Sequence, residues 1–178
     1  MTGFDKLSNQ VFLIDFGLAQ HFRDPSTRRH APVVSGLNIV GTITFTSINS
    51  HLGQTQSRRD DLESLVYSIV YLCRGRLPWQ GIIKGRSIEQ YGASVLEKKL
   101  ASTKTLCQGL PAPFVAFTQH IQSLGFDEKP QYDYLHNLLT QCSAHGSNGV
   151  MSKPVTVSPS FSKVGIPTNC SSPHTGRT

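Results

Sequence analysis

The 178-residue sequence predicts a mainly α-helical fold. Two observations carry this prediction. Apolar residues between positions 57 and 75 recur at helical spacing, and polar residues at two places form the capping pattern that begins a helix. Residues 11–14 have the apolar, β-branched character of a short strand. The length suits one folded domain of ordinary size.

Residues 11–14, V-F-L-I, predict a short β-strand that runs into a tight turn at Asp15, Phe16 and Gly17. From residue 18 to about residue 56 the hydrophobic periodicity is lost, while proline and glycine recur. An irregular stretch of that length inside a compact domain usually serves a function. We therefore expect functional residues between this strand and the first helix.

The first predicted helix begins after Ser57 and ends at Gly75. In the string S-R-R-D, the Ser57 hydroxyl and the Asp60 carboxylate form a capping box that satisfies free N–H groups of the first turn. Glycine tolerates the left-handed backbone that commonly ends a helix. The apolar residues between these two signals cover a wide face, so we expect this helix to be central and nearly enclosed.

Three further helices are predicted. A second capping box, at Ser87 and Gln90, begins a helix that reaches about residue 101, and its charged end at residues 97–99 is expected to be solvated. Prolines at 111 and 113 open a third helix, which closes at Gly125. Leucines at 135, 138 and 139 mark a fourth, shorter helix.

After residue 142 the composition changes to Ser, Gly, Pro and Thr, with few large apolar residues. Such a stretch cannot bury enough apolar surface to offset the entropy lost on ordering. We therefore divide the chain into a folded domain, residues 1–142, and a disordered tail, residues 143–178.

The composition limits the classes of binding partner and the cellular compartments that we expect. Lys and Arg number 17 against 11 Asp and Glu, and this small excess predicts no specific nucleic-acid partner. No run of about 18 apolar residues occurs, so we expect no membrane partner. The four cysteines form no C-x-x-C motif, and the N-terminus does not resemble a signal peptide. A cytoplasmic and/or nuclear location is therefore expected.

A strand that runs into D-F-G is typical of one chemical arrangement. The aspartate, here Asp15, ligates the magnesium ion of a bound nucleotide, Phe16 packs beneath the turn, and Gly17 allows the bend. The tripeptide also occurs by chance in many proteins, where it is only the turn that ends a strand. The functional interpretation of D-F-G therefore depends on the other motifs that accompany it in the sequence.

Six strings accompany this turn in order: V-F-L-I-D-F-G-L-A, R-D-P-S-T, G-T-I-T-F-T-S-I-N-S-H-L-G, Q-S-R-R-D-D-L-E-S-L, L-P-W-Q-G and F-D-E-K-P-Q-Y-D-Y-L. In this order and spacing they resemble the C-terminal lobe of the casein kinase 1 family of serine/threonine protein kinases. The resemblance covers about residues 11–142, and S-I-N in place of the usual A-P-E is specific to that family among kinases. It implies a protein-kinase-like C-terminal lobe, with a short β segment before D-F-G and without the N-terminal lobe.

The resemblance assigns roles to individual residues. Asp15 matches the magnesium ligand for Mg-ATP, with Phe16 and Gly17 as its partners, and residues 18–49 match the activation segment. Thr42 matches the threonine that faces the catalytic aspartate. Asp61 matches a buried helix aspartate that, in kinases, accepts hydrogen bonds from the catalytic loop; an ordinary first-turn acid is the alternative. The activation segment would close at Ser47, Ile48 and Asn49.

Two departures from the family pattern stand beside these matches. The catalytic-loop aspartate and asparagine, the glycine-rich loop and the strand lysine with its glutamate partner do not occur in the 178 residues. This chain therefore contains no catalytic residue of its own, and one magnesium ligand without the rest should give a negligible rate.

The second departure concerns the basic cluster that binds acidic or pre-phosphorylated substrates in the family. The positions that match its basic residues hold Leu37, Thr44 and Gln90, although Gly81 is kept. Each loss removes a charge-assisted contact of about 1.5–3 kcal/mol. Basic residues at 84 and 86 are close in sequence and could substitute.

Two hypotheses follow. In the first, the sequence is the C-terminal part of a casein kinase 1-like enzyme, cut at a gene-model or fragment boundary, and the whole protein phosphorylates protein substrates. In the second, the chain is complete and catalytically dead, and its helical lobe binds partners of related kinases. The polar leader at residues 2–9 favours the first hypothesis, because it fits a linker inside a longer protein.

Overall fold

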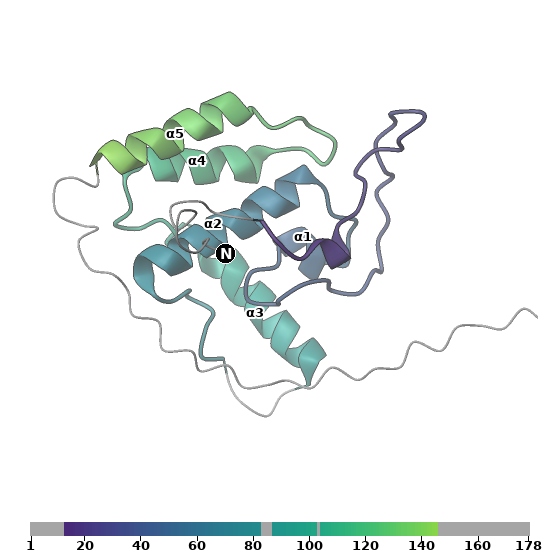
Figure 1. Cartoon of the computed structure of the whole chain (residues 1–178). Helices are drawn as coiled ribbons and strands as arrows, with labels where there is room; N and C mark the ends of the chain where they lie inside the picture. The colour runs from purple at the N-terminus through teal and green to yellow at the C-terminus, as the bar shows by residue number, and fades with distance from the viewer. Residues whose placement is uncertain (1–12, 83–86, 103, 146–178) are drawn as a thin grey trace, which may run out of the picture.

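The computed structural model describes residues 13–82, 87–102 and 104–145. These residues form five α-helices and one short 3₁₀ helix (Figure 1). No β-strand occurs in the described part of the chain, where the one bridge outside a strand pairs Arg23 with His30. The prediction of a mainly α-helical fold is confirmed.

The predicted strand before D-F-G is not observed. Residues 11 and 12 lie outside the described residues, and Leu13 and Ile14 have no regular structure. Leu13 is 81% exposed and Ile14 is 51% exposed. A strand is stable only beside a partner strand, and the described residues offer none. A local apolar, β-branched run was therefore not sufficient to predict a strand here.

Helix α2 spans Arg58–Arg74 and begins and ends where the sequence predicts. The Ser57 N–H donates to Asp60 Oδ2 at 2.8 Å, which is the aspartate half of the predicted capping box. Gly75, at φ 72°, is the left-handed residue that ends the helix. One face of α2 is buried, but Leu72 is 67% exposed, so the helix is less enclosed than expected.

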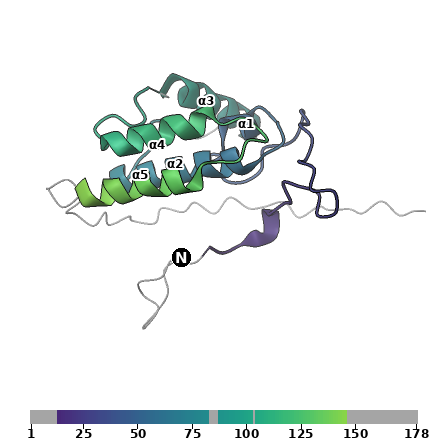
Figure 2. The same ribbon diagram turned by 90° about the horizontal axis from the view of Figure 1, so that it is seen from above.

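The remaining helices agree with the predicted order. Helix α3 spans Ile88–Ser102, and the Gln90 N–H donates to Ser87 Oγ at 3.3 Å in its first turn. Helix α4 spans Ala112–Ser123 and helix α5 spans Tyr132–His145, so the last helix is longer than α4 and not shorter as expected. These two form an antiparallel pair that packs against α2 through α4 (Figures 1 and 2). Because α5 continues to His145, it passes the expected domain boundary at residue 142, and the rest of the predicted tail lies outside the described residues.

The core lies where α2 and α4 meet the turn after α2. The Trp79 ring packs edge-on against Tyr67 of α2, with 4.8 Å between the ring centroids. The buried residues of the core are Val66, Tyr67, Val70, Leu77, Trp79, Val95, Leu106, Cys107, Phe114, Phe117, Ile121, Leu135 and Leu138.

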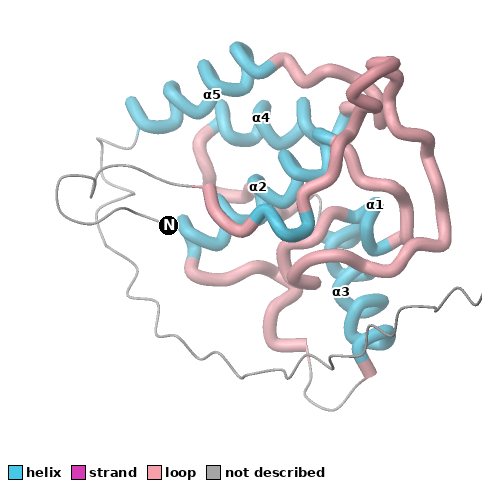
Figure 3. Tube along the Cα trace, turned by 45° about the vertical axis from the view of Figure 1, so that its right-hand side comes forward, coloured by secondary structure: helices cyan, strands magenta, loops and turns pink. Residues whose placement is uncertain are grey.

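A long irregular segment extends from the 3₁₀ helix η2 (Phe16–Leu18) to the four-residue helix α1 (Ile48–His51). It runs as loop along one side of the helices (Figure 3), and η2 stands away from the five α-helices (Figure 2). Large apolar side chains in its first half are exposed, in contrast to those of the helices. The fold thus consists of a packed helical part and an irregular segment that joins it near α1.

Candidate functional site

The D-F-G turn lies at the exposed beginning of the irregular segment. Asp15 adopts a left-handed backbone conformation, with φ 64° and ψ 71°. Aspartate is one of the few residues that adopt this conformation readily. Phe16 is 66% exposed, so the expectation that it packs beneath the turn is wrong for this structure. Asp15 therefore presents its carboxylate on an exposed turn without a packed support.

Asp15 offers a metal ion a single protein ligand. Among the described residues, no group of three or more His, Cys, Asp or Glu side chains could hold a metal ion. Magnesium is commonly bound through one or two carboxylates, while phosphate and water oxygens fill the other positions. The donor set fits such a partial site, because a lone carboxylate can supply one of those ligands.

Two sets of contacts hold the middle of the irregular segment, one to the start of α2 and one to the residues after α1. The guanidinium carbon of Arg58, at the start of α2, lies 4.5 Å from the centroid of the Phe22 ring. Further along, the Leu37 N–H donates to the Gly53 carbonyl at 2.9 Å. Gly53 has φ +68°, and a Cβ at this position would lie 2.7 Å from the Leu37 carbonyl oxygen. Only glycine allows this close approach.

Next comes a tight turn at residues 42–46, called the 42–46 turn below. The Thr42 carbonyl accepts the N–H groups of Phe45 at 2.8 Å and Thr46 at 3.0 Å. It also accepts the Thr46 hydroxyl at 3.0 Å. The Thr42 residue itself is exposed. The turn therefore holds its own shape and leaves Thr42 accessible.

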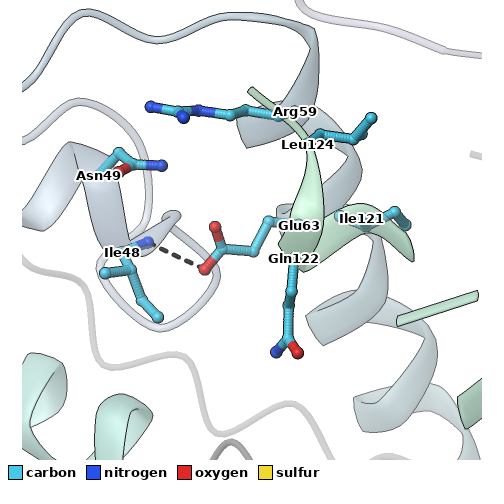
Figure 4. Close-up of a pocket in the computed structure, with 7 residues that line it drawn as sticks. All are labelled: Ile48, Asn49, Arg59, Glu63, Ile121, Gln122 and Leu124. Atoms are coloured by element: carbon cyan, nitrogen blue, oxygen red, sulfur yellow. Dashed lines mark hydrogen bonds between the residues drawn. The ribbon is translucent and has the colours of Figure 1, made fainter. Parts of the chain in front are cut away.

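The tripeptide after this turn is fixed to α2 by hydrogen bonds. The Ser47 hydroxyl donates to Asp60 Oδ1 at 2.8 Å, and the Asn49 amide donates to the same oxygen at 3.1 Å. The Ile48 N–H donates to Glu63 Oε1 at 3.0 Å (Figure 4). All three residues that the sequence singles out as the end of the segment thus contact two acidic side chains of one helix.

The buried aspartate of this site is Asp60. It is 1% exposed, whereas Asp61 is exposed. The expectation of a buried carboxylate at Asp61 therefore needs correction, because the N3 position of the capping box turns Asp60 toward α1. Partial desolvation, together with the neighbouring Asp60 carboxylate, raises the pKa of Asp61. The capping box predicted from the sequence already named Asp60, but only as a cap.

The buried lysine that lies beneath the 42–46 turn was not predicted from the sequence. Lys99 of α3 is 2% exposed, although residues 97–99 were expected to be solvated. Its ammonium nitrogen donates to the Ile43 carbonyl at 3.1 Å and to the Thr46 carbonyl, and it lies 3.1 Å from His51 Nε2. A charged E-K-K string gives no local signal of burial, because the partners come from distant residues.

Burial sets the ionisation of this group of side chains. Desolvation lowers the pKa of Lys99 to about 7, although the Glu63 carboxylate opposes the shift. Desolvation, and then the charge of Lys99, lower the pKa of His51 to about 4. Burial raises the pKa of Glu63, whose carboxylate accepts the Tyr67 hydroxyl. Burial and the Glu63 charge likewise raise the pKa of Tyr67.

A hollow of about 300 Å³ opens beside the fixed tripeptide, between α1, α2 and α4 (Figure 4). Polar or charged side chains and apolar side chains both line it; they are Asn49, Arg59, Glu63 and Gln122, and Ile48, Ile121 and Leu124. Arg59 Nε lies 3.7 Å from Asp60 Oδ2, so the buried carboxylate has a cation at the edge of the hollow.

The positions that match the family's substrate-anion site are only partly brought together. The Thr44 carbonyl accepts the Trp79 indole N–H at 2.7 Å, which places Thr44 beside the turn that contains Gly81. Gly81 is exposed and has φ +82°, and a Cβ at this position would meet no atom of the described residues within 4 Å. Gln90 lies exposed in the first turn of α3, and Leu37 is 46% exposed. The basic residues at 84 and 86 lie outside the described residues.

No family model matches this sequence. In the described part of the chain, no helix is both long enough and apolar enough to cross a membrane.

Proposed function

We propose that this chain is the helical part of a casein kinase 1-like serine/threonine protein kinase domain, of which residues 18–49 are the activation segment. The observation that carries the proposal is the attachment of Ser47, Ile48 and Asn49 to α2 through Asp60 and Glu63. These are the residues that the resemblance assigns to the end of the segment. An activation segment works only when it is held in one position, since phosphoryl transfer depends on positioning.

The exposed apolar residues around D-F-G also support the proposal. Leu13, Ile14, Phe16 and Leu18 are each more than half exposed. Contiguous exposed apolar groups of this kind usually mark a surface that contacts another part of a protein. In a kinase domain this turn lies next to the N-terminal lobe, which would cover these side chains.

The proposal gives the residues of this chain limited chemical roles. Asp15 would supply one carboxylate ligand to the magnesium ion of ATP. The ion, when bound, neutralises the charge that develops on the transferred phosphoryl group. Thr42 would face the catalytic aspartate, which must come from outside these 178 residues. Protein serine or threonine would accept the phosphoryl group, and this chain by itself would be inactive.

The substrate preference should differ from that of the family. Charge-assisted hydrogen bonds contribute about 1.5–3 kcal/mol each, and Leu37, Thr44 and Gln90 cannot form them with a phosphate in the way that basic residues do. Thr44 also uses its carbonyl to hold Trp79. We therefore expect a weak preference for pre-phosphorylated substrates.

The first test is to sequence the native transcript upstream of the codon for Met1. The proposal expects an in-frame region that encodes a glycine-rich loop, its lysine and a catalytic-loop aspartate. The longer protein is then assayed for transfer of labelled phosphate from Mg-ATP to casein. Asp15→Asn should lower the rate at least about 100-fold, because the variant would lose a carboxylate ligand for the ion that neutralises charge on the phosphoryl group.

The matched control is Asp133→Asn, because Asp133 is also exposed but lies in α5. This variant should keep the full rate. Equal rates for the Asp15 and Asp133 variants would contradict the role given to Asp15. A transcript that begins at Met1 would favour the alternative, a catalytically dead module that binds protein partners.

A further inference from the structure

The side chain of Lys99 joins three parts of the chain that are far apart in sequence. It reaches from α3 to the carbonyl groups of Ile43 and Thr46 in the 42–46 turn and to His51 in α1. Its nitrogen also lies 4.8 Å from the centroid of the Tyr67 ring and 5.3 Å from that of Trp79. The 42–46 turn is therefore held in place by one titratable side chain.

The partners of Lys99 suit both of its protonation states. An ammonium group has three donors, and it would donate to both carbonyls and to an unprotonated His51 Nε2. A neutral amine has two donors and one lone pair. It would still donate to both carbonyls, and it would accept the N–H of His51 Nε2. No heavy atom has to move between these two arrangements.

The other nitrogen of His51 distinguishes the two states. His51 Nδ1 is buried and has no hydrogen-bond partner. With Lys99 charged, the proton of the neutral imidazole must sit on Nδ1, where it is a buried donor without an acceptor. With Lys99 neutral, the proton sits on Nε2, and this N–H donates to the Lys99 amine. Nδ1 is a buried group without a partner in both states, so the cost that distinguishes the charged state is the burial of the ammonium charge itself.

We propose that Lys99 and His51 form a one-proton latch beneath the 42–46 turn, which loosens below neutral pH and tightens above it. When the latch releases its proton, one N–H of the Lys99 ammonium passes to His51 Nε2 and the proton on Nδ1 is given up to solvent. The charge falls by one, and His51 changes tautomer. This inference does not depend on the kinase proposal, because it uses only contacts within the described residues.

The groups around Lys99 shift its pKa in opposite directions. From α2, the Glu63 carboxylate favours the charged lysine, and the Tyr67 hydroxyl donates to that carboxylate. Burial disfavours the charge more strongly, so the pKa of Lys99 falls from 10.5 to about 7. His51 stays neutral because its pKa falls to about 4. One proton is therefore exchanged near pH 7.

The direction of the effect follows from these values. Between about pH 7 and 10.5 an opened chain holds a proton on Lys99 that the closed chain has lost. The closed form therefore gains stability as the pH rises through this window, by up to about tenfold per pH unit in the opening equilibrium. Below pH 7 both forms carry the proton, and the closed form bears the full cost of burying it.

The direct test is a nuclear magnetic resonance titration of the unaltered, isotopically labelled chain between pH 5.5 and 9. We expect one lysine side chain to titrate near pH 7. Over the same range, one histidine that stays neutral should change from the Nδ1–H to the Nε2–H tautomer. Neither signal requires a variant that folds. The inference is overturned if no lysine titrates below about pH 9 or if His51 keeps one tautomer throughout.

Two variants assign these signals and measure their consequence. Lys99→Met removes the titrating group but keeps an unbranched side chain, and Lys98→Met is the matched control because Lys98 is exposed on the same helix. In the native chain, protection of the Phe45 and Thr46 amides from exchange should rise about tenfold between pH 6 and 8, after correction for intrinsic rates. The rise should persist in Lys98→Met and disappear in Lys99→Met. A rise that persists in Lys99→Met would contradict the latch.

Discussion

The packed helices and the irregular segment before α1 differ in what holds them. In the helices, Phe117 is 1% exposed and lies among side chains from several elements. In the segment, Phe16 is 66% exposed. The two residues have identical side chains, so hydrophobicity does not explain the difference. Helical periodicity places apolar residues on one shared face, and the segment has no such face to present.

The end of the irregular segment is held by hydrogen bonds to buried polar side chains. The segment is fixed at its end by Asp60 and Lys99, which are both almost completely buried. Directional hydrogen bonds require each partner to be placed correctly, whereas apolar packing tolerates small shifts. We infer that apolar packing of the helices supplies most of the stability and that these two polar side chains determine where the segment lies.

The largest expected difference in stability is between variants of the two phenylalanines. Phe117→Ala should lower the free energy of unfolding by about 3–5 kcal/mol, because it leaves a cavity in the core. Phe16→Ala should change it by no more than about 0.5 kcal/mol, because its side chain is exposed. Urea denaturation of both variants measures the two values. Equal losses would show that the segment packs as tightly as the helices.

A smaller effect is expected from two neighbouring acids of α2. Asp60→Ala should cost about 3 kcal/mol, because it leaves the buried Ser47 hydroxyl and the Ser57 N–H without their acceptor. Asp61→Ala is the matched control, and it should change the stability by no more than about 0.5 kcal/mol. The same urea titration decides between them. A larger loss for Asp61→Ala would place the structural carboxylate at the other residue.

The smallest expected effect is local. In Gly53→Ala the new Cβ would collide with the Leu37 carbonyl, from which it would lie 2.7 Å away. We expect the Leu37 amide to exchange about tenfold faster, which corresponds to about 1.4 kcal/mol of opening free energy. Gly36→Ala is the control, because Gly36 also has positive φ but has open space around it. Unchanged exchange at Leu37 in Gly53→Ala would show that this contact does not hold the segment.

The sequence predicted the helical part well for a local reason. Capping boxes and terminal glycines act within three or four residues, so the ends of α2 could be located from the string itself. No strand forms at Leu13 and Ile14, the described part of the predicted strand, because a strand depends on a partner strand that the local string does not contain. Ser47, Ile48 and Asn49 were singled out through a family resemblance, but their partners on α2 were not foreseen.

The sequence by itself determined the helices, their caps and the apolar faces that form the core. The tertiary structure decided which charged residues are buried. Lys99 contacts groups 48 to 56 residues away in the chain, and the Ser47 hydroxyl reaches Asp60 across 13 residues. No spacing rule covers such distances, because they are set by how the helices pack. Burial then gives these polar residues the energies and the pKa values that a solvated side chain does not have.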